Sequence, residues 1–129
     1  MPGLNRMQLI GRLGHDPEVR VTPNGRKFAR FNVAVNRVWN NDSGERHVST
    51  DWFSVEVWGR LCEICEQYLS KGRLVYVEGR MQNERWEDDK GETRSRAKLV
   101  AQEMQMLDRP GDLGEDEAAE GERSPVAVA

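Results

Sequence analysis

The amino-acid sequence predicts an all-β domain, a small five-stranded Greek-key barrel with one helix between the third and fourth strands. Five stretches alternate apolar and polar side chains with the period of two that β-strands have. Between the third and fourth of these stretches, the apolar residues change to helical spacing. Strands and helices do not alternate along the chain, which favours a barrel over a doubly wound parallel sheet.

The first two strands are predicted before residue 37. Residues 5–13 alternate with one apolar face, and we expect residues 18–21 to continue this strand after a turn. The Pro-Asn-Gly run at residues 23–25 is a strong turn signal, because proline presets the backbone and Asn-Gly tolerates positive φ. The second strand, residues 28–36, follows with this core face: Ala29, Phe31, Val33 and Val35.

The third predicted strand, residues 50–58, presents two tryptophans on one face. The other face is an ordinary buried set: Phe53, Val55 and Val57. Trp52 and Trp58 share their face with Glu56, and an unpaired carboxylate is very costly in an apolar medium. We therefore expect both indoles to be at least partly exposed. Exposed indoles on a sheet are suited to stacking on flat, polar-edged ligands such as nucleobases.

The connections around this strand differ in character. A polar stretch at residues 40–48 predicts a long hairpin loop before it. After it, apolar residues at i, i+3, i+4 and i+7 predict an amphipathic helix over residues 60–71, which Gly72 ends. The fourth strand, residues 74–86, again places a tryptophan, Trp86, among charged side chains.

The last predicted strand carries a basic row on its outer face, formed by Arg94, Arg96 and Lys98. A second polar hairpin loop, residues 87–92, precedes it. Among small barrels the OB-fold has this order of elements, and its loops between strands one and two and between four and five commonly hold ligands. Both loops have counterparts here, so we predict an OB-fold.

Length and charge predict one domain followed by an acidic tail. The chain has 129 residues and a net charge of −3, enough for one core. Residues 108–129 contain seven acidic and two basic side chains, which leaves 15 acidic and 17 basic side chains in residues 1–107. Hydrophobic alternation also stops after Leu107. We expect a domain over residues 1–107 and a disordered acidic tail over residues 108–129.

Several classes of protein are disfavoured. No apolar run approaches the length of a membrane span, and the N-terminus lacks the apolar core of a signal peptide, so we expect a cytoplasmic protein. Cys62 and Cys65 form a single Cys-x-x-Cys, which favours two buried helical cysteines over zinc or a redox pair. His15 and His47 lack a catalytic partner at recognisable spacing. We expect no catalytic residue, no metal and no cofactor.

Short stretches spread over residues 4–107 are weak signals singly and highly specific together. They are Leu9-Ile10-Gly11-Arg12-Leu13-Gly14, Asp16-Pro17-Glu18-Val19-Arg20, Pro23-Asn24-Gly25, Trp52-Phe53, Trp58-Gly59-Arg60-Leu61, Tyr68-Leu69-Ser70-Lys71-Gly72, Val75-Tyr76-Val77-Glu78-Gly79-Arg80, Arg85-Trp86 and Met104-Gln105-Met106-Leu107. With these stretches the chain resembles the bacterial single-stranded DNA-binding proteins.

This resemblance implies an OB-fold that assembles as a homotetramer on the nucleoid. It would bind single-stranded DNA without sequence preference during replication, recombination and repair. It also implies base stacking by the tryptophans at matching positions: Trp39, Trp52, Trp58 and Trp86. At the position of Trp58 the family often has phenylalanine. Trp39 has the parity of the core face, so only its position at the edge of the loop and the resemblance make Trp39 a candidate for base stacking.

The end of the chain departs from the family pattern. Family tails usually close on an acidic tip with an aromatic residue that recruits replication and repair enzymes. This tail ends Ser-Pro-Val-Ala-Val-Ala. The sequence therefore does not support recruitment through the tip, and a looser electrostatic role remains.

Basic side chains on outward faces or near the aromatics are the candidate phosphate contacts: Arg6, Arg12, Arg30, Arg37, Arg80, Arg85, Arg94, Arg96 and Lys98. A solvated face explains any one of them about equally well, but the basic row and the pairing of Arg85 with Trp86 favour binding. Two alternatives stay open. One is an OB-fold protein–protein adaptor of the replication machinery, and the other is an RNA-binding barrel that tolerates or prefers a 2′-hydroxyl.

Overall fold

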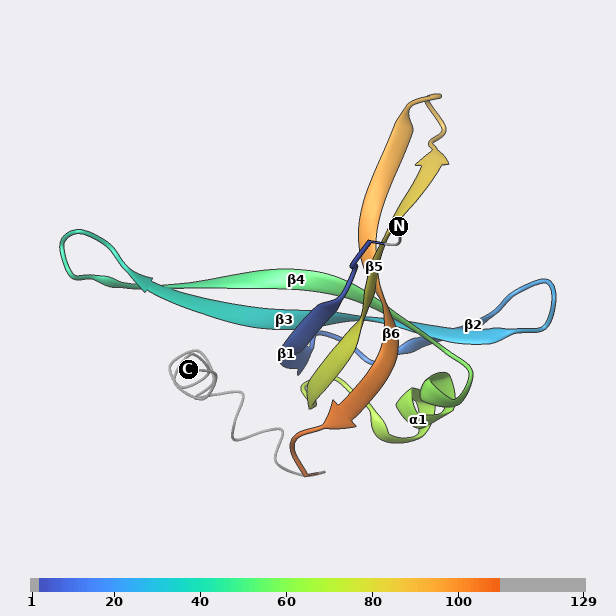
Figure 1. Ribbon diagram of the computed structural model, residues 1–129, viewed down its shortest axis with the longest axis horizontal. Coiled ribbons are helices and arrows are strands. Elements are labelled where there is room, and N and C mark those ends of the chain that lie inside the picture. The colour runs from blue at the N-terminus through green and yellow to red at the C-terminus, as the bar shows by residue number, and fades with distance from the viewer. Residues whose placement is uncertain (1–2, 110–129) are drawn as a thin grey trace.

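The computed structural model describes residues 3–109 as a closed β-barrel with one helix (Figure 1). The elements are β1 (Met7–Leu13), β2 (Glu18–Val21), β3 (Lys27–Asn40), β4 (Arg46–Trp58), α1 (Arg60–Tyr68), β5 (Leu74–Glu87) and β6 (Thr93–Met106). The sheet order is β1-β5-β6-β4-β3-β2, and β1 also pairs with β3. The predicted five-strand barrel is confirmed, and the expected continuation at residues 18–21 is a short strand of its own, β2, that pairs with β3.

Two glycines allow strands to approach closely where the barrel closes. A Cβ on Gly11 of β1 would collide with the carbonyl oxygen of Ala34 on β3. Gly79 follows an irregularity in the β5–β6 pairing, and a Cβ there would collide with the carbonyl oxygen of Val100. Both positions therefore need glycine, because the backbone of the neighbouring strand lies too close for a side chain.

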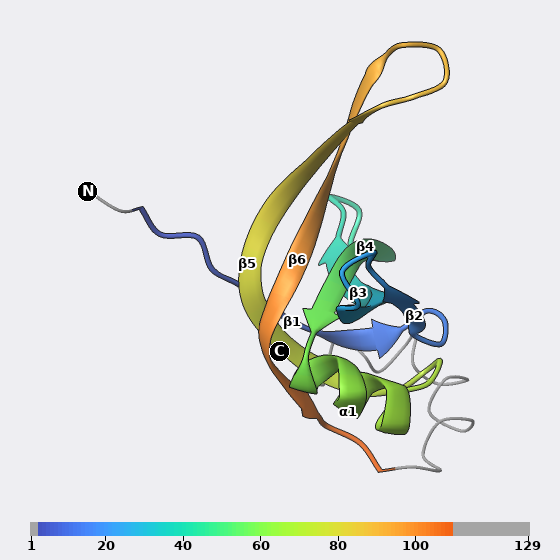
Figure 2. The same ribbon diagram turned by 90° about the vertical axis from the view of Figure 1, so that its right-hand side faces the viewer.

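Three hairpins project from the barrel as arms (Figures 1 and 2). In Figure 1 the β3–β4 arm extends to the left, the β2–β3 arm to the right and the β5–β6 arm upward. The hairpin predicted over residues 40–48 is present, but its loop is shorter than predicted, because strand pairing continues to Asn40 and Arg46. The side-chain oxygen of Asn41 accepts hydrogen bonds from the amides of Ser43 and Glu45 at 3.0 and 2.9 Å, which makes a tight turn.

Helix α1 lies across the end of the barrel opposite the tip of the β5–β6 arm (Figure 2). It ends at Tyr68, three residues before the predicted end, because Leu69 is already extended with φ −93° and ψ 144°. Cys62 and Cys65 on its inner face are fully buried, which confirms that interpretation. Burial raises the pKa of the Cys65 thiol to about 12, so this sulfur is unreactive at neutral pH.

The core fills the barrel with most of the inward-facing residues that the alternation predicted and with the two helical cysteines, while Val35 and Phe53, also predicted there, are only partly buried against it. The largest fully buried side chains are Phe31, Val33, Val55, Val57, Cys62, Cys65, Val75, Val77 and Leu99. Within residues 3–109, no helix combines the length and the apolar character that a bilayer span requires.

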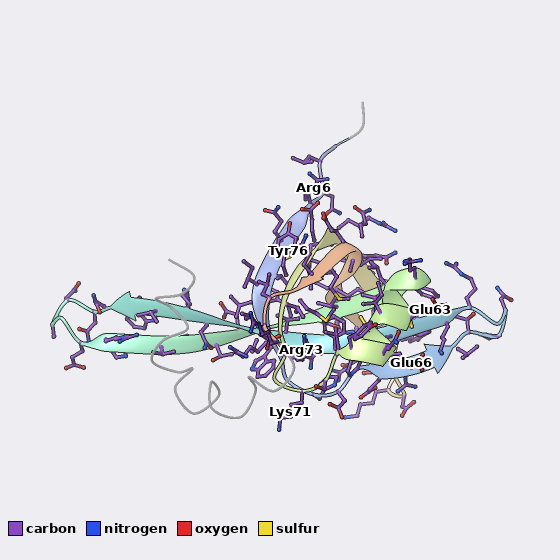
Figure 3. The ribbon with its side chains drawn as sticks, turned by 90° about the horizontal axis from the view of Figure 1, so that it is seen from below. Arg6, Glu63, Glu66, Lys71, Arg73 and Tyr76 are labelled. Carbon is purple, nitrogen blue, oxygen red and sulfur yellow. The ribbon has the colours of Figure 1, made fainter. Side chains whose placement is uncertain are left out.

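The chain after β6 is held against the barrel by Asp108. Arg73, near the centre of Figure 3, donates from Nε to Asp108 Oδ1 at 2.8 Å, and the Leu74 amide donates to Oδ2 at 3.1 Å. A second nitrogen of Arg73 donates to the carbonyl oxygen of Tyr68 at 3.0 Å. Asp108, the first residue of the predicted tail, therefore packs with the domain, and the tail from residue 110 on lies outside the described residues.

Candidate nucleic-acid interface

Three of the four tryptophans lie on one outer face of the barrel. Across β3 and β4, Trp58 pairs with Phe28, and Trp52 has the same outward parity. Trp86 lies on the outward-facing positions of β5. Trp52 and Trp86 are 56% and 42% exposed, and Trp58 is half-buried. The expected partial exposure of Trp52 and Trp58 is confirmed.

Glu56 is itself buried on this face, although the tryptophans beside it are partly exposed as expected. It is only 3% exposed. Donors from three strands satisfy it: Lys98 Nζ at 2.9 Å and Arg30 Nε at 3.1 Å to Oε2, and Trp58 Nε1 at 2.7 Å to Oε1. A buried carboxylate is tolerated when it is paired in this way. The bond from Nε1 also fixes the orientation of the Trp58 indole.

The pKa of Glu56 reflects two opposing effects. Burial would raise it, but the hydrogen bonds from Lys98, Trp58 and Arg30 together outweigh burial, so the pKa lies below the ordinary 4.5. The carboxylate is therefore ionised at neutral pH.

This lowered pKa predicts a loss of stability in acid. A carboxyl group with a lower pKa in the folded than in the unfolded state stabilises the fold fully above its unfolded value, 4.5, and loses that effect as pH falls through the folded value. Urea unfolding between pH 7 and pH 3 should show a smaller acid-induced loss for Glu56→Gln than for the unmodified chain. An identical pH dependence in both proteins would contradict the assignment.

Ion pairs continue from Glu56 across the outer face to Trp86. Arg30, which binds Glu56, also lies 3.6 Å from Glu84 Oε1 on β5. Glu84 in turn accepts from Arg96 Nη2 at 2.9 Å, and the Arg96 guanidinium lies over the Trp86 ring, 5.6 Å from its centroid. These ion pairs therefore join β3, β4, β5 and β6, and the last cation of the series, Arg96, contacts the Trp86 ring.

Trp52 lies against the loop that follows β1. A Cβ on Gly14 would collide with the Cζ3 and Cη2 atoms of its ring. Beside it, a hollow of about 260 Å³ opens between β4 and the β5–β6 hairpin, lined by Trp52, Phe53, Ser54, Met81, Ala97 and Leu99. The Trp52 indole therefore packs against Gly14 on one side and borders an open hollow on another.

Trp39 lies apart from the other three tryptophans. Its parity on β3 is that of the core face, so it occupies the opposite face of the β3–β4 arm from Trp52. It stacks on His47 with ring centroids 4.4 Å apart and an interplanar angle of 15°, and it is 44% exposed. A ligand that reached both Trp39 and Trp52 would have to wrap around this arm.

Many of the candidate cations are already paired with carboxylates. The pairs are Arg6–Glu78 at 3.4 Å, Arg12–Asp108 at 3.6 Å, Arg30–Glu56 at 3.1 Å, Arg94–Asp88 at 2.7 Å, Arg96–Glu84 at 2.9 Å and Lys98–Glu56 at 2.9 Å. The side chains of Arg12 and Lys98 are only 14% and 11% exposed. The structure therefore turns these two toward buried carboxylates, away from the surface that the sequence suggested for them.

Three other candidates keep their charge available. Arg37, Arg80 and Arg85 are exposed, and none of them forms an ion pair within residues 3–109. In the same part of the chain, no group of three or more histidine, cysteine or acidic side chains is placed to hold a metal ion.

Sequence reasoning missed the residues that support the tryptophans. In the sequence, Gly14 stands out only as the end of the stretch at residues 9–14, and Glu56 only as a reason for the exposure of its neighbours. The pairing of Glu56 could have been predicted from the cationic residues at outward positions of the two neighbouring strands, β3 and β6. The register of the strands brings these residues next to Glu56.

Comparison with known proteins agrees with this geometry. The model of the single-strand binding protein family matches residues 4–107. A relative from Chlorobaculum tepidum, "Single-stranded DNA-binding protein 1", is 43% identical over 106 residues, which are 81% of this chain and 65% of the relative. The "Single-stranded DNA-binding protein" of Neisseria meningitidis serogroup A is 46% identical over 104 residues, 81% of this chain and 60% of the relative.

The fold also matches a solved structure, "Plasmodium falciparum SSB complex with ssDNA", with a TM-score of 0.77 and 28% identity. The match covers 84% of this chain and 98% of that one. The chain spans less than two thirds of the length of the curated relatives named above. The matched residues nevertheless include the whole barrel, and on this evidence the chain belongs to the single-strand binding protein family.

Proposed function

We propose that this chain binds and protects single-stranded DNA without sequence preference during replication, recombination and repair. The observation that carries the proposal is the outer face of the barrel, on which Trp52, Trp58 and Trp86 lie together with the exposed Arg80. Arg37 and Arg85 are exposed as well, but by the parity of their strands they lie on the opposite faces of the β3–β4 and β5–β6 arms. The family and the solved complex of a relative with single-stranded DNA support it.

The proposed mechanism needs no bond chemistry. Every nucleobase has a π-face, so stacking on an indole tolerates any sequence, and cationic side chains hold the backbone between stacked bases. Arg37, Arg80 and Arg85 are the arginines that we assign to phosphates, because no ion pair within the described residues neutralises them. Duplex DNA hides its base faces, so preference for single strands follows from the same contacts.

Tryptophan fluorescence tests the proposal. We expect poly(dT) to quench it strongly, with saturation at a fixed ratio of nucleotides to protein, and affinity to fall with salt at a slope of about −0.7 per phosphate neutralised. A parallel titration with poly(rU) separates DNA binding from RNA binding. A folded protein without quenching would contradict the proposal and favour the protein–protein adaptor.

Gly14→Ala is expected to weaken this binding without unfolding the barrel. The added methyl group would collide with the Trp52 ring, so the ring must move away from its present position against Gly14. We expect a several-fold loss of affinity for poly(dT) and a shifted tryptophan emission maximum. Gly3→Ala, where a Cβ meets no other atom within 4 Å, is the matched control and should change neither.

We also propose that the chain assembles as a homotetramer. β1 pairs with β5 along most of its length but with β3 at only two positions, so much of its second edge has no strand partner among the described residues. Open strand edges favour pairing with another chain. Next to it, Gln8 bonds to Tyr76 and Glu78 at 3.0 Å each, and Arg6 and Tyr76 lie on the same side of the barrel (Figure 3).

Light scattering of the full chain tests the assembly. A mass of four times 14.8 kDa is expected, and a monomer at micromolar concentration would contradict it. We place the protein in the cytoplasm on nucleoid DNA, where a fluorescent fusion should colocalise with DNA stain.

A further inference from the structure

Arg26 extends a stack of planar side chains at the β2–β3 arm. Its guanidinium lies over the Trp58 ring, 4.7 Å from the centroid. Trp58 in turn stacks on Phe28 with centroids 4.6 Å apart and an interplanar angle of 25°. The guanidinium of Arg30 lies over Phe28 at 5.3 Å. Four planar groups from β3, β4 and the preceding turn therefore form one continuous stack.

This stack occupies much of the indole surface that a base would use. Phe28 and Arg26 cannot fill the same space, so each covers its own part of Trp58, which is half-buried. The Nε1 edge is also engaged, because it donates to Glu56 at 2.7 Å. Trp58 is therefore much less available for stacking than Trp52, whose side chain is 56% exposed.

Arg26 itself is exposed and keeps its charge. Its neighbours are paired: Arg20 lies 3.4 Å from Glu18, and Lys27 Nζ lies 2.6 Å from Glu66. Within residues 3–109, Arg26 forms no ion pair. Its main chain is fixed by the turn, where the Thr22 hydroxyl oxygen accepts from the Arg26 amide at 3.0 Å.

We propose that Arg26 is a nucleotide-contacting residue, on whose guanidinium plane, backed by Trp58, a base of the bound single strand stacks while its charge attracts a phosphate. Guanidinium planes stack on nucleobases as aromatic rings do, and arginine combines such stacking with phosphate binding. The Trp58 indole acts here as the support that orients Arg26. This inference rests on the proposed binding of single-stranded DNA and adds a residue that the sequence analysis did not select.

Three variants of the full chain test it, with binding of a dye-labelled dT oligomer followed by anisotropy. Arg26→Ala is expected to weaken binding about 5- to 150-fold, the range seen when a stacking contact is removed. Arg26→Lys keeps the positive charge but lacks the planar guanidinium. We therefore expect the salt dependence of binding to stay unchanged, while affinity falls by most of the loss seen for Arg26→Ala. Arg20→Ala removes a charge from the same arm that Glu18 already pairs at 3.4 Å, and it should change affinity less than either.

The outcomes separate this inference from the function on which it rests. If the unmodified chain fails to bind the oligomer, the proposed function fails and the inference with it. If the unmodified chain binds and Arg26→Ala binds equally well or more tightly, Arg26 only covers Trp58 and the inference is overturned. Full affinity in Arg26→Lys would also overturn it, because a point charge would then suffice. Since Arg26 is exposed, thermal unfolding of the variants should match that of the unmodified chain.

Discussion

Asp108→Ala is expected to lower the free energy of unfolding by about 3–5 kcal/mol, the cost of leaving one member of a buried ion pair without its partner. The side chains of Arg73 and Asp108 are only 5% and 6% exposed, and Arg73 Nε lies 2.8 Å from Oδ1. Removal of the carboxylate would also leave the Leu74 amide without its acceptor and Arg12 without its carboxylate at 3.6 Å. The position lies outside the outer face, so DNA affinity of the folded fraction should not change.

Urea unfolding at a fixed protein concentration measures this loss. Glu18→Ala is the matched control, since the Glu18–Arg20 pair is 60% and 64% exposed and such pairs contribute about 0–1 kcal/mol. A loss below 1 kcal/mol for Asp108→Ala would show that the segment after β6 is not needed for the fold.

The barrel was predictable from sequence because its signal is local. Alternation assigned Phe31 and Val55 to the core, since a strand with one buried face repeats every two residues. The length of the β3–β4 arm was not predictable in the same way. The sequence shows no strand alternation at residues 46–48 or at Asn40, because most of these side chains are polar. They form strands because the turn at Asn41 brings β3 and β4 together beyond the core.

The candidate interface was predictable in its aromatic residues and less so in its charges. Outward parity identified Trp52 and Trp86, and exposure agrees. Whether a cation is available depends on which carboxylate lies across the sheet, and that requires register. Lys98 is held by Glu56 from a strand 42 residues earlier in the chain, a contact that no short-range pattern contains.

Trp52→Ala is expected to weaken binding of single-stranded DNA by ~1–3 kcal/mol, the usual loss on removing a base-stacking side chain. The side chain is 56% exposed, and it lies beside the hollow between β4 and the β5–β6 hairpin, so a base has room to reach it. Folding should change little, because the ring contributes little to the core. Trp86→Ala should have an effect of the same size, and the two losses should add if the residues contact separate bases.

Binding of a labelled dT oligomer to these variants gives the measurement. Val48→Ala is the matched control, because Val48 is 45% exposed on the same face of β4 and has no ring. If Trp52→Ala and Val48→Ala lose affinity equally, contact area alone accounts for the effect and stacking is excluded at this position. If Trp52→Ala instead unfolds the protein, the indole supports the barrel through its contact with Gly14, and the binding face must be reassigned around Trp86 and Arg80.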